Sequence, residues 1–352
     1  MKNRIGALMF LLASGLLSFA AGAQPQKVWH VGVLYWSGTI AGQVAMRKGL
    51  EQEVARINQA ARKSGAPTMQ LWTEVAGDGP HGVDRQIAQM RKMVDAKPDV
   101  IIVQPTDNAA LTQPLLAANK AGIPVIAYDQ YIAGGMLAVY ISSDNYQAGY
   151  LDGEYLVSLF EKKKPLRLVL VEYPTISSAS DRVSGFLDAL HNYGRGYTIM
   201  KAYRAIDTVE GEKAAAAMLR DFPQKGSIDA VFTVNDGGGL AVVDALARAG
   251  RDEIVVATVD GDPASMKNIR DRRLTRIDAA QFCGPLGARA ARAAYDILSG
   301  KDVPARILVP TFPVTADTLD KYPGWNGPIP ASFQKPWPAQ HATWQNKAAG
   351  PL

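Results

Sequence analysis

The feature that most constrains this chain is a regular alternation of strand-like and helix-like segments. Val28–Tyr35 is apolar and β-branched, and the stretch after it repeats apolar residues at helical spacing from Leu50 to Ala61. Further pairs follow until Val125–Tyr128, a buried-type strand introduced by Gly122 and Pro124. An alternation of this kind predicts a parallel sheet with helices on both faces.

The same alternation then starts again. Leu166–Glu172 opens a second series of similar size, and Ile254–Val259 closes it. The stretch Ile132–Asn145, with paired glycines and serines, suits a crossover between the two series. A mature chain of about 326 residues also exceeds one comfortable core. The sequence therefore predicts an α/β protein with two doubly wound, parallel-sheet lobes.

A strand-helix-strand segment from Arg276 to Val309 is expected to return and complete the first sheet. The chain should then cross between the lobes three times, near Ser143, Gln281 and Val309, and three strands crossing one boundary make a hinge. The expected division is a first lobe of 24–143 plus 282–309, a second lobe of 144–281 plus 310–316, and a tail of 317–352.

That tail is rich in proline and holds three of the six tryptophans. Proline excludes a long helix, while the tryptophans argue against free disorder. We expect an extended segment packed over the lobes, as surface covering rather than as a contact for a ligand or partner.

The first residues resemble a secretory signal peptide. Lys2 and Arg4 precede an apolar run from Ile5 to Phe19, and Ala21-Gly22-Ala23 offers a cleavage site. The run is short for a membrane anchor, and no cysteine follows the site to carry a lipid. We expect an exported protein, cleaved near Ala23 and free in solution, rather than a retained anchor.

Composition argues against several classes. The formal charge of +5 falls to +3 without the two basic residues of the signal peptide, which does not indicate nucleic acid. Cys283 stands alone, so no internal disulfide is possible, and we interpret it as a core residue rather than a nucleophile. The four histidines are scattered and the usual catalytic and phosphate-binding motifs are missing. We expect no enzyme, metal or cofactor.

Polar residues stand one step beyond several predicted strands. Ligands of open parallel sheets bind beyond the carboxyl ends of the strands, which makes Asp129, Asn235 and Asp260 candidates for ligand contact. A carboxylate can accept hydrogen bonds from two neighbouring hydroxyls, and an amide both donates and accepts. Residues of the same types that we interpret as helix caps are Asp107, Asp144 and Asp236.

Two aromatic residues end the first strand. Alternation along a strand sends one of Tyr35 and Trp36 into the core, and we expect Trp36 to face the cleft, where its ring could pack on the C–H face of a sugar.

Several segments, in this order and spacing, resemble the ribose-type periplasmic binding proteins, the sugar receptors of ABC transporters. The resemblance runs from about Val28 to Phe312. Its landmarks are Pro105-Thr106-Asp107, Ile123 to Asp129, Ile141 to Asn145, Val231 to Asp236, Val259-Asp260-Gly261 and Ala279-Ala280-Gln281.

The resemblance implies the type I periplasmic binding fold, a periplasmic location and closure of a hinge on a ligand. It adds Gln281 and Arg182 to the candidate ligand-binding residues. The departures from the ribose-type pattern make ribose itself a poor expectation. Gly42 and Gln43 stand where that pattern has two phenylalanines, and Gln130 stands where it has an arginine. A second arginine of the pattern falls on Ser180, two places before Arg182, and an aromatic residue falls on Ile206.

The expected ligand is a small neutral polyhydroxylated solute, such as a pentose or tetritol. The expected partner is an ABC permease of the inner membrane; a membrane histidine kinase or chemoreceptor, with the chain as a sensor, is the alternative. A repressor with the same core would need a DNA-binding headpiece where this chain has its signal peptide.

Overall fold

The computed structural model describes residues 26–161 and 164–347, so the predicted signal peptide lies outside the described residues. Its central strands are short apolar runs. β3 (Val100–Val103) and β4 (Val125–Tyr128) are buried along their whole length, as a parallel strand covered on both faces requires.

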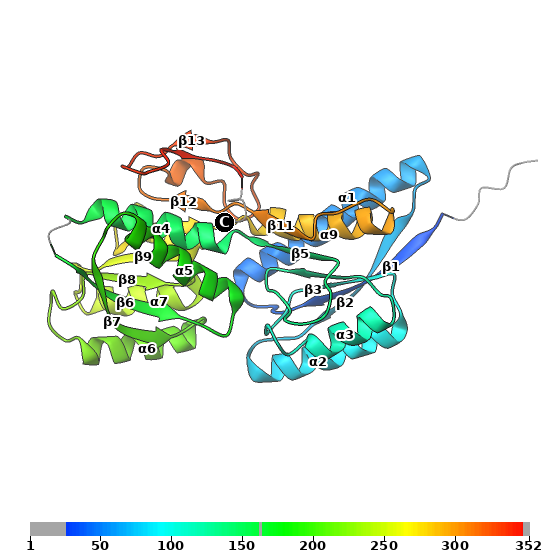
Figure 1. Ribbon diagram of the computed structural model, residues 1–352, viewed down its shortest axis with the longest axis horizontal. Helices are drawn as coiled ribbons and strands as arrows, with labels where there is room; N and C mark the ends of the chain where they lie inside the picture. Colours follow the sequence, from blue (N-terminus) through cyan, green and yellow to red (C-terminus); the bar gives the residue numbers. More distant parts are fainter. Residues whose placement is uncertain (1–25, 162–163, 348–352) are drawn as a thin grey trace, which may run out of the picture.

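The first sheet has six parallel strands in the order β11-β5-β4-β3-β1-β2. Its remaining strands are β1 (Val28–Tyr35), β2 (Thr68–Val75), β5 (Val139–Ser143) and β11 (Arg306–Val309). Two helices lie on each face (Figure 1). They are α1 (Ala41–Ser64) and α9 (Cys283–Leu298) on one face, and α2 (Gly79–Ala96) and α3 (Thr112–Lys120) on the other.

The second sheet has the order β12-β10-β9-β8-β6-β7, and only β12 is antiparallel. Its strands are β6 (Leu166–Glu172), β7 (Tyr197–Arg204), β8 (Ala230–Thr233), β9 (Val255–Asp260), β10 (Thr275–Ala280) and β12 (Phe312–Val314). One face packs on α4 (Asn145–Leu159) and α5 (Ser177–Asn192), the other on α6 (Thr208–Asp221) and α7 (Asp236–Arg248). α8 (Pro263–Arg270) joins β9 to β10. The predicted class of two doubly wound α/β lobes is confirmed.

The main chain passes between the sheets after β5, after β10 and between β11 and β12. One expectation about the return segment is wrong. The strand near Arg276 does not complete the first sheet, because β10 pairs in parallel with β9 and extends the second. Only α9 and β11 return to the first lobe.

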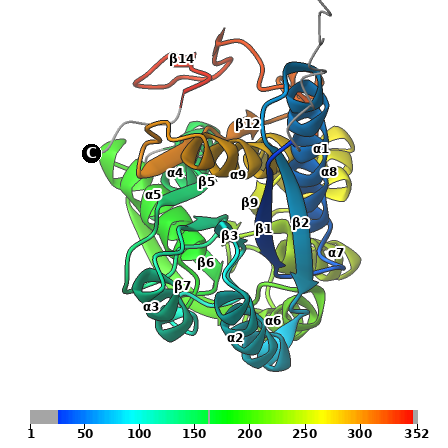
Figure 2. The ribbon, with the colours of Figure 1, turned by 90° about the vertical axis from the view of Figure 1, so that its right-hand side faces the viewer.

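The tail, η1 (Leu319–Lys321), β13 (Phe333–Gln334) and β14 (Thr343–Trp344), lies on the hinge side of the molecule, seen from two directions in Figures 1 and 2. Trp344 is 2% exposed and belongs to a core cluster that includes residues of both lobes, and its ring packs on Phe312 of β12. Its Nε1 donates to the carbonyl oxygen of Thr311 at 2.9 Å, in the third crossing. Lys335 donates to Glu154 of α4 at 2.5 Å. The tail is thus bonded to the hinge and to the second lobe.

Candidate functional site

Two of the predicted ligand-binding aspartates have an unusual backbone conformation. Asp129 follows β4 with φ 68°, and Asp260 ends β9 with φ 130°. Positive φ is unfavourable for residues with a side chain, and such strain is concentrated at functional sites. Both residues stand at carboxyl ends of parallel strands, one in each lobe.

Asp129 is buried at the edge of the first lobe. Its Oδ2 accepts a hydrogen bond from Nε2 of Gln104 at 3.1 Å, and its carbonyl oxygen accepts one from Oγ of Ser142 at 2.9 Å. Burial raises the pKa of Asp129 to about 6, and the negative charge of Asp260 adds to the rise; the Gln104 bond and the charge of Arg182 oppose it. These interactions indicate that charges from both lobes converge here.

Asp260 is held by two side chains of the predicted set. Nη1 of Arg182, on α5, lies 3.0 Å from Oδ1 of Asp260. Nε2 of Gln281 donates to the same oxygen at 2.5 Å. Burial raises the pKa of Asp260, while Arg182 and Gln281 oppose the rise. Asp260, Arg182 and Gln281 therefore form one connected polar group.

Gln281 also ties two hinge crossings together. Its Oε1 accepts from Oγ of Ser143 at 2.7 Å, so the ends of β5 and β10 are linked through one side chain. The polar group of the site is continuous with the hinge.

Asn235 acts as a helix cap in this arrangement. Its Oδ1 accepts from the backbone N–H of Gly238 and its Nδ2 donates to the carbonyl oxygen of Ile206. Since both ends of the amide are bonded within the second lobe, Asn235 has less capacity for a ligand than the two aspartates.

The two aromatic residues at the end of β1 face different ways. Tyr35 is fully buried in the first lobe's core. Trp36 is partly buried and packs against the apolar core cluster of the second lobe. Trp36 therefore reaches across the boundary between the lobes.

Of the three predicted helix caps, Asp144 is confirmed and the other two are wrong. Asp144 caps α4. Asp107 accepts from the N–H groups of Ala109 and Ala110 in a turn, but α3 begins only at Thr112, with Leu111 at its capping position. Asp236 caps nothing, because Asn235 already occupies the capping position of α7.

Asp236 is instead a buried side chain of the second lobe. It accepts hydrogen bonds from Oγ1 of Thr258 and from the N–H of Asp262. Burial, and next the charge of Asp278, raises the pKa of Asp236.

The departures from the ribose-type pattern have distinct places in the structure. Gln130 donates from Nε2 to Oγ of Ser178 on α5 at 2.9 Å, which bonds one lobe to the other. Gln43 is buried and accepts from the N–H of Ser37. Neither residue reproduces the chemistry of the side chain it replaces.

Two residues that bond members of the candidate site were not predicted as site residues from the sequence. Asn145 accepts from Nε of Arg182 at 2.9 Å and so orients the guanidinium; it was assigned only to the crossover motif. Ser178 carries the bond between the lobes, and no local sequence signal distinguishes it from its neighbours.

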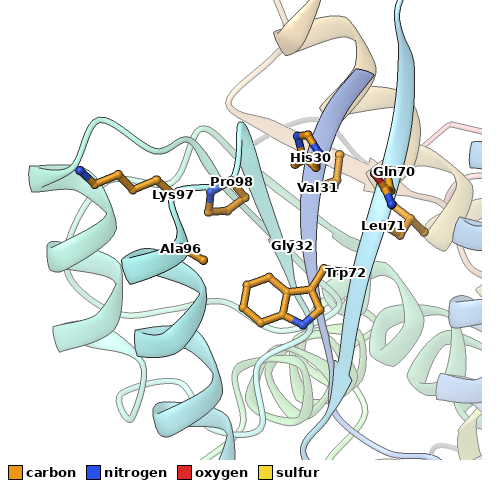
Figure 3. Close-up of a pocket in the computed structure, with 9 residues that line it drawn as sticks. All are labelled: His30, Val31, Gly32, Gln70, Leu71, Trp72, Ala96, Lys97 and Pro98. Atoms are coloured by element: carbon orange, nitrogen blue, oxygen red, sulfur yellow. The ribbon is translucent and has the colours of Figure 1, made fainter. Parts of the chain in front are cut away.

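A shallow pocket on the first lobe is a separate feature (Figure 3). It lies between β1, β2 and the end of α2, and Trp72 points into it. His30, Gln70 and Pro98 line it toward the amino ends of the strands, away from the ends that carry Asp129 and Asp260. The strand-end rule therefore argues against it as the ligand site.

Within residues 26–161 and 164–347, no three histidine, cysteine or acidic side chains are grouped as a metal site. None of the helices described there has both the length and the apolar character to cross a membrane.

The chain is similar in sequence to known sugar-binding proteins. Ribose import binding protein RbsB of Bacillus subtilis is 27% identical over 269 residues, 76% of this chain and 81% of its own length. RbsB of Escherichia coli is 27% identical over 233 residues, or 65% and 75% of the two chains.

Solved structures show the same fold at lower identity. A Caulobacter myo-inositol binding protein matches with a TM-score of 0.72 and 22% identity, over 84% of this chain and 96% of its own. An ABC transporter solute binding protein from Agrobacterium vitis with bound allitol matches with a TM-score of 0.73 and 23% identity, over 84% of this chain and 98% of its own. The family model described as a periplasmic binding protein domain matches residues 31–302. The chain belongs to this family of periplasmic binding proteins.

Proposed function

We propose that this chain captures a small neutral sugar or polyol between its lobes in the periplasm and delivers it to an ABC permease. The observation that carries the proposal is the convergence of Asp129 from one lobe with Asp260 and Arg182 from the other. An ionised carboxylate has two oxygens and can accept hydrogen bonds from several hydroxyls at once.

The charge balance of the site supports an uncharged ligand. The guanidinium of Arg182 is buried and already bonded to Asp260, Asn145 and the carbonyl oxygen of Val234. An anionic ligand would have to displace Asp260 or lie beside two carboxylates. A pentose, a tetritol or a similar polyol meets neither obstacle.

Capture by hinge closure follows from the division of the site. We take 24–143 plus 282–309 as the first lobe and 144–281 plus 310–316 as the second. Neither lobe alone can satisfy the ligand's hydroxyls, so the ligand binds the closed form better and shifts the population towards it. The closed surface would then be what the membrane partner recognises.

Transport is favoured over sensing by the relatives. The curated relatives are named as import or periplasmic sugar-binding proteins, and several solved structures are described as ABC transporter solute binding proteins. Export with cleavage near Ala23 is part of the proposal, and the mature protein should begin near Gln24.

A thermal-shift screen of the purified mature chain tests the function. The panel contains D-ribose, D-allose, allitol and myo-inositol, with amino acids and organic acids as the opposing set. We expect at least one sugar or polyol to raise the melting temperature, and the Asp129→Ala variant to lose that response while its unliganded melting curve stays cooperative. Stabilisation by amino acids or carboxylates alone would contradict the proposal.

A further inference from the structure

Two aromatic side chains of the tail reach the polar group of the site from behind the hinge. Nε1 of Trp325 donates to the carbonyl oxygen of Asp260 at 2.7 Å. Oη of Tyr322 donates to the carbonyl oxygen of Gln281 at 2.6 Å. Both acceptors belong to residues whose side chains are bonded to each other in the site. The tail is therefore fixed to the backbone that carries the candidate ligand-binding groups.

Trp325 also contacts the first lobe. Its carbonyl oxygen accepts from the N–H of Gly284, at the start of α9, at 2.8 Å. A β-carbon on Gly42, at the start of α1, would lie 4.0 Å from Cζ2 of the indole and 3.7 Å from Sγ of Cys283. The indole thus spans from the end of β9 in one lobe to the start of α1 in the other.

The surroundings of Cys283 place this contact beside the site. Burial raises the pKa of the Cys283 thiol, and the negative charges of Asp260 and Asp129 raise it further. The thiol therefore lies within electrostatic range of both carboxylates, and the Trp325 ring lies next to it across Gly42.

The ring of Trp325 is only partly buried. Trp325 packs against the core cluster that includes residues of both lobes, and it is not fully covered there. The side chains assembled around Asp260 are polar and suit hydroxyls, whereas a sugar or polyol also has a C–H face. An indole beside a carboxylate supplies the apolar surface that this face requires.

From this geometry we propose that Trp325, supplied by the tail, forms an aromatic wall of the ligand site and packs on the C–H face of the bound sugar or polyol. The inference rests on the proposed function, and it assigns the tail a role in recognition rather than covering. Its indole N–H is bonded to the carbonyl oxygen of Asp260, which holds the wall beside the carboxylate.

Calorimetric titration with D-ribose, D-allose, allitol and myo-inositol tests the assignment. Trp325→Ala removes the ring, while Trp325→Phe keeps an aromatic face and removes only the N–H donor. Phe333→Ala is the matched control, since Phe333 is an aromatic residue of the same tail that packs on Phe312 and Trp344. Circular dichroism establishes that each variant is folded.

We expect Trp325→Ala to weaken the binding of the best probe by tenfold or more, Trp325→Phe to stay within about threefold, and Phe333→Ala to stay within about twofold. Equal losses of affinity in both Trp325 variants would mean that only the indole N–H bond matters, which would contradict the role of the ring as a wall. Equal effects of Trp325→Ala and Phe333→Ala, or none, would also overturn it. If the unaltered chain binds no probe, the proposed function itself fails, and this inference with it.

Discussion

Arg182 and Asp260 form an ion pair at the inner end of the second lobe, with 3.0 Å between Nη1 and Oδ1. The arginine side chain is 6% exposed and that of the aspartate 23%. The carboxylate is thus the more accessible partner, and the one able to offer an oxygen to a ligand.

Replacing Asp260 by Ala should weaken ligand binding by about 1.5–3 kcal/mol, the range for hydrogen bonds to a charged group. That is roughly tenfold to more than a hundredfold in Kd. Calorimetric titration measures the loss, and the unliganded variant should stay folded. Asp107→Ala is the control, because the Asp107 carboxylate accepts hydrogen bonds from the turn before α3. Wild-type affinity in the Asp260 variant would place the site elsewhere.

Ligand affinity should depend on pH through Asp129, whose pKa burial raises to about 6 in the unliganded protein. Since the ionised carboxylate accepts hydroxyl hydrogen bonds more strongly, Kd should rise about tenfold between pH 7 and pH 5.

Stability of the unliganded protein should change in the opposite sense. The folded-state pKa of Asp129 lies above its ordinary value of 3.8. The stabilising contribution of this group to the free energy of unfolding is therefore fully present below about pH 4 and is lost as the pH rises through about 6. The Asp129→Asn variant should flatten the pH dependence of both quantities. An unchanged pH profile in that variant would assign the titration to another group.

Closure should depend on the bond between Gln130 and Ser178, which joins the lobes at 2.9 Å. Ser178→Ala should weaken affinity by about 0.5–1.5 kcal/mol, because it destabilises only the closed form. Ser180→Ala is the matched control on the same helix, since its hydroxyl bonds within the second lobe. Small-angle scattering should show a larger unliganded radius of gyration for Ser178→Ala only. Identical curves for the two variants would contradict a role in closure.

The tail should contribute to stability through Lys335 and Glu154, whose side chains are 6% and 0% exposed. Lys335→Met leaves a buried carboxylate without its cation and should lower the free energy of unfolding by about 3–5 kcal/mol. Lys321→Met, at an exposed tail lysine paired at 3.9 Å, should change it by less than about 1 kcal/mol. Urea unfolding measures both. Equal stabilities would mean that the tail is not docked through this pair.

Positions that follow a rule local to the chain could be predicted from the sequence. Asp129 and Asp260 were predicted because the strand before each ends in an apolar run, and the end of a parallel strand is where ligands bind. Asn235 satisfies the same rule but caps α7. The choice between the two roles depends on Ile206, which is 29 residues away.

Elements stabilised by distant partners could not be predicted. α4 has no single apolar stripe, because its buried residues include Asp152 and Glu154. Glu154 is bonded by Lys335 and Trp337, more than 180 residues later in the chain. The contact between Trp325 and Asp260 is likewise a result of tertiary packing. The proline content of the tail does not indicate which part of the molecule the tail packs on.

The central claim is that a sugar or polyol binds between the lobes, at Asp129 and Asp260. A crystal structure of the chain with whichever of D-ribose, D-allose, allitol or myo-inositol gives the largest thermal shift tests it most directly. We expect ligand hydroxyls within about 3.2 Å of carboxylate oxygens of both residues. Ligand bound elsewhere, such as beside Trp72 in the shallow pocket of the first lobe, would contradict it.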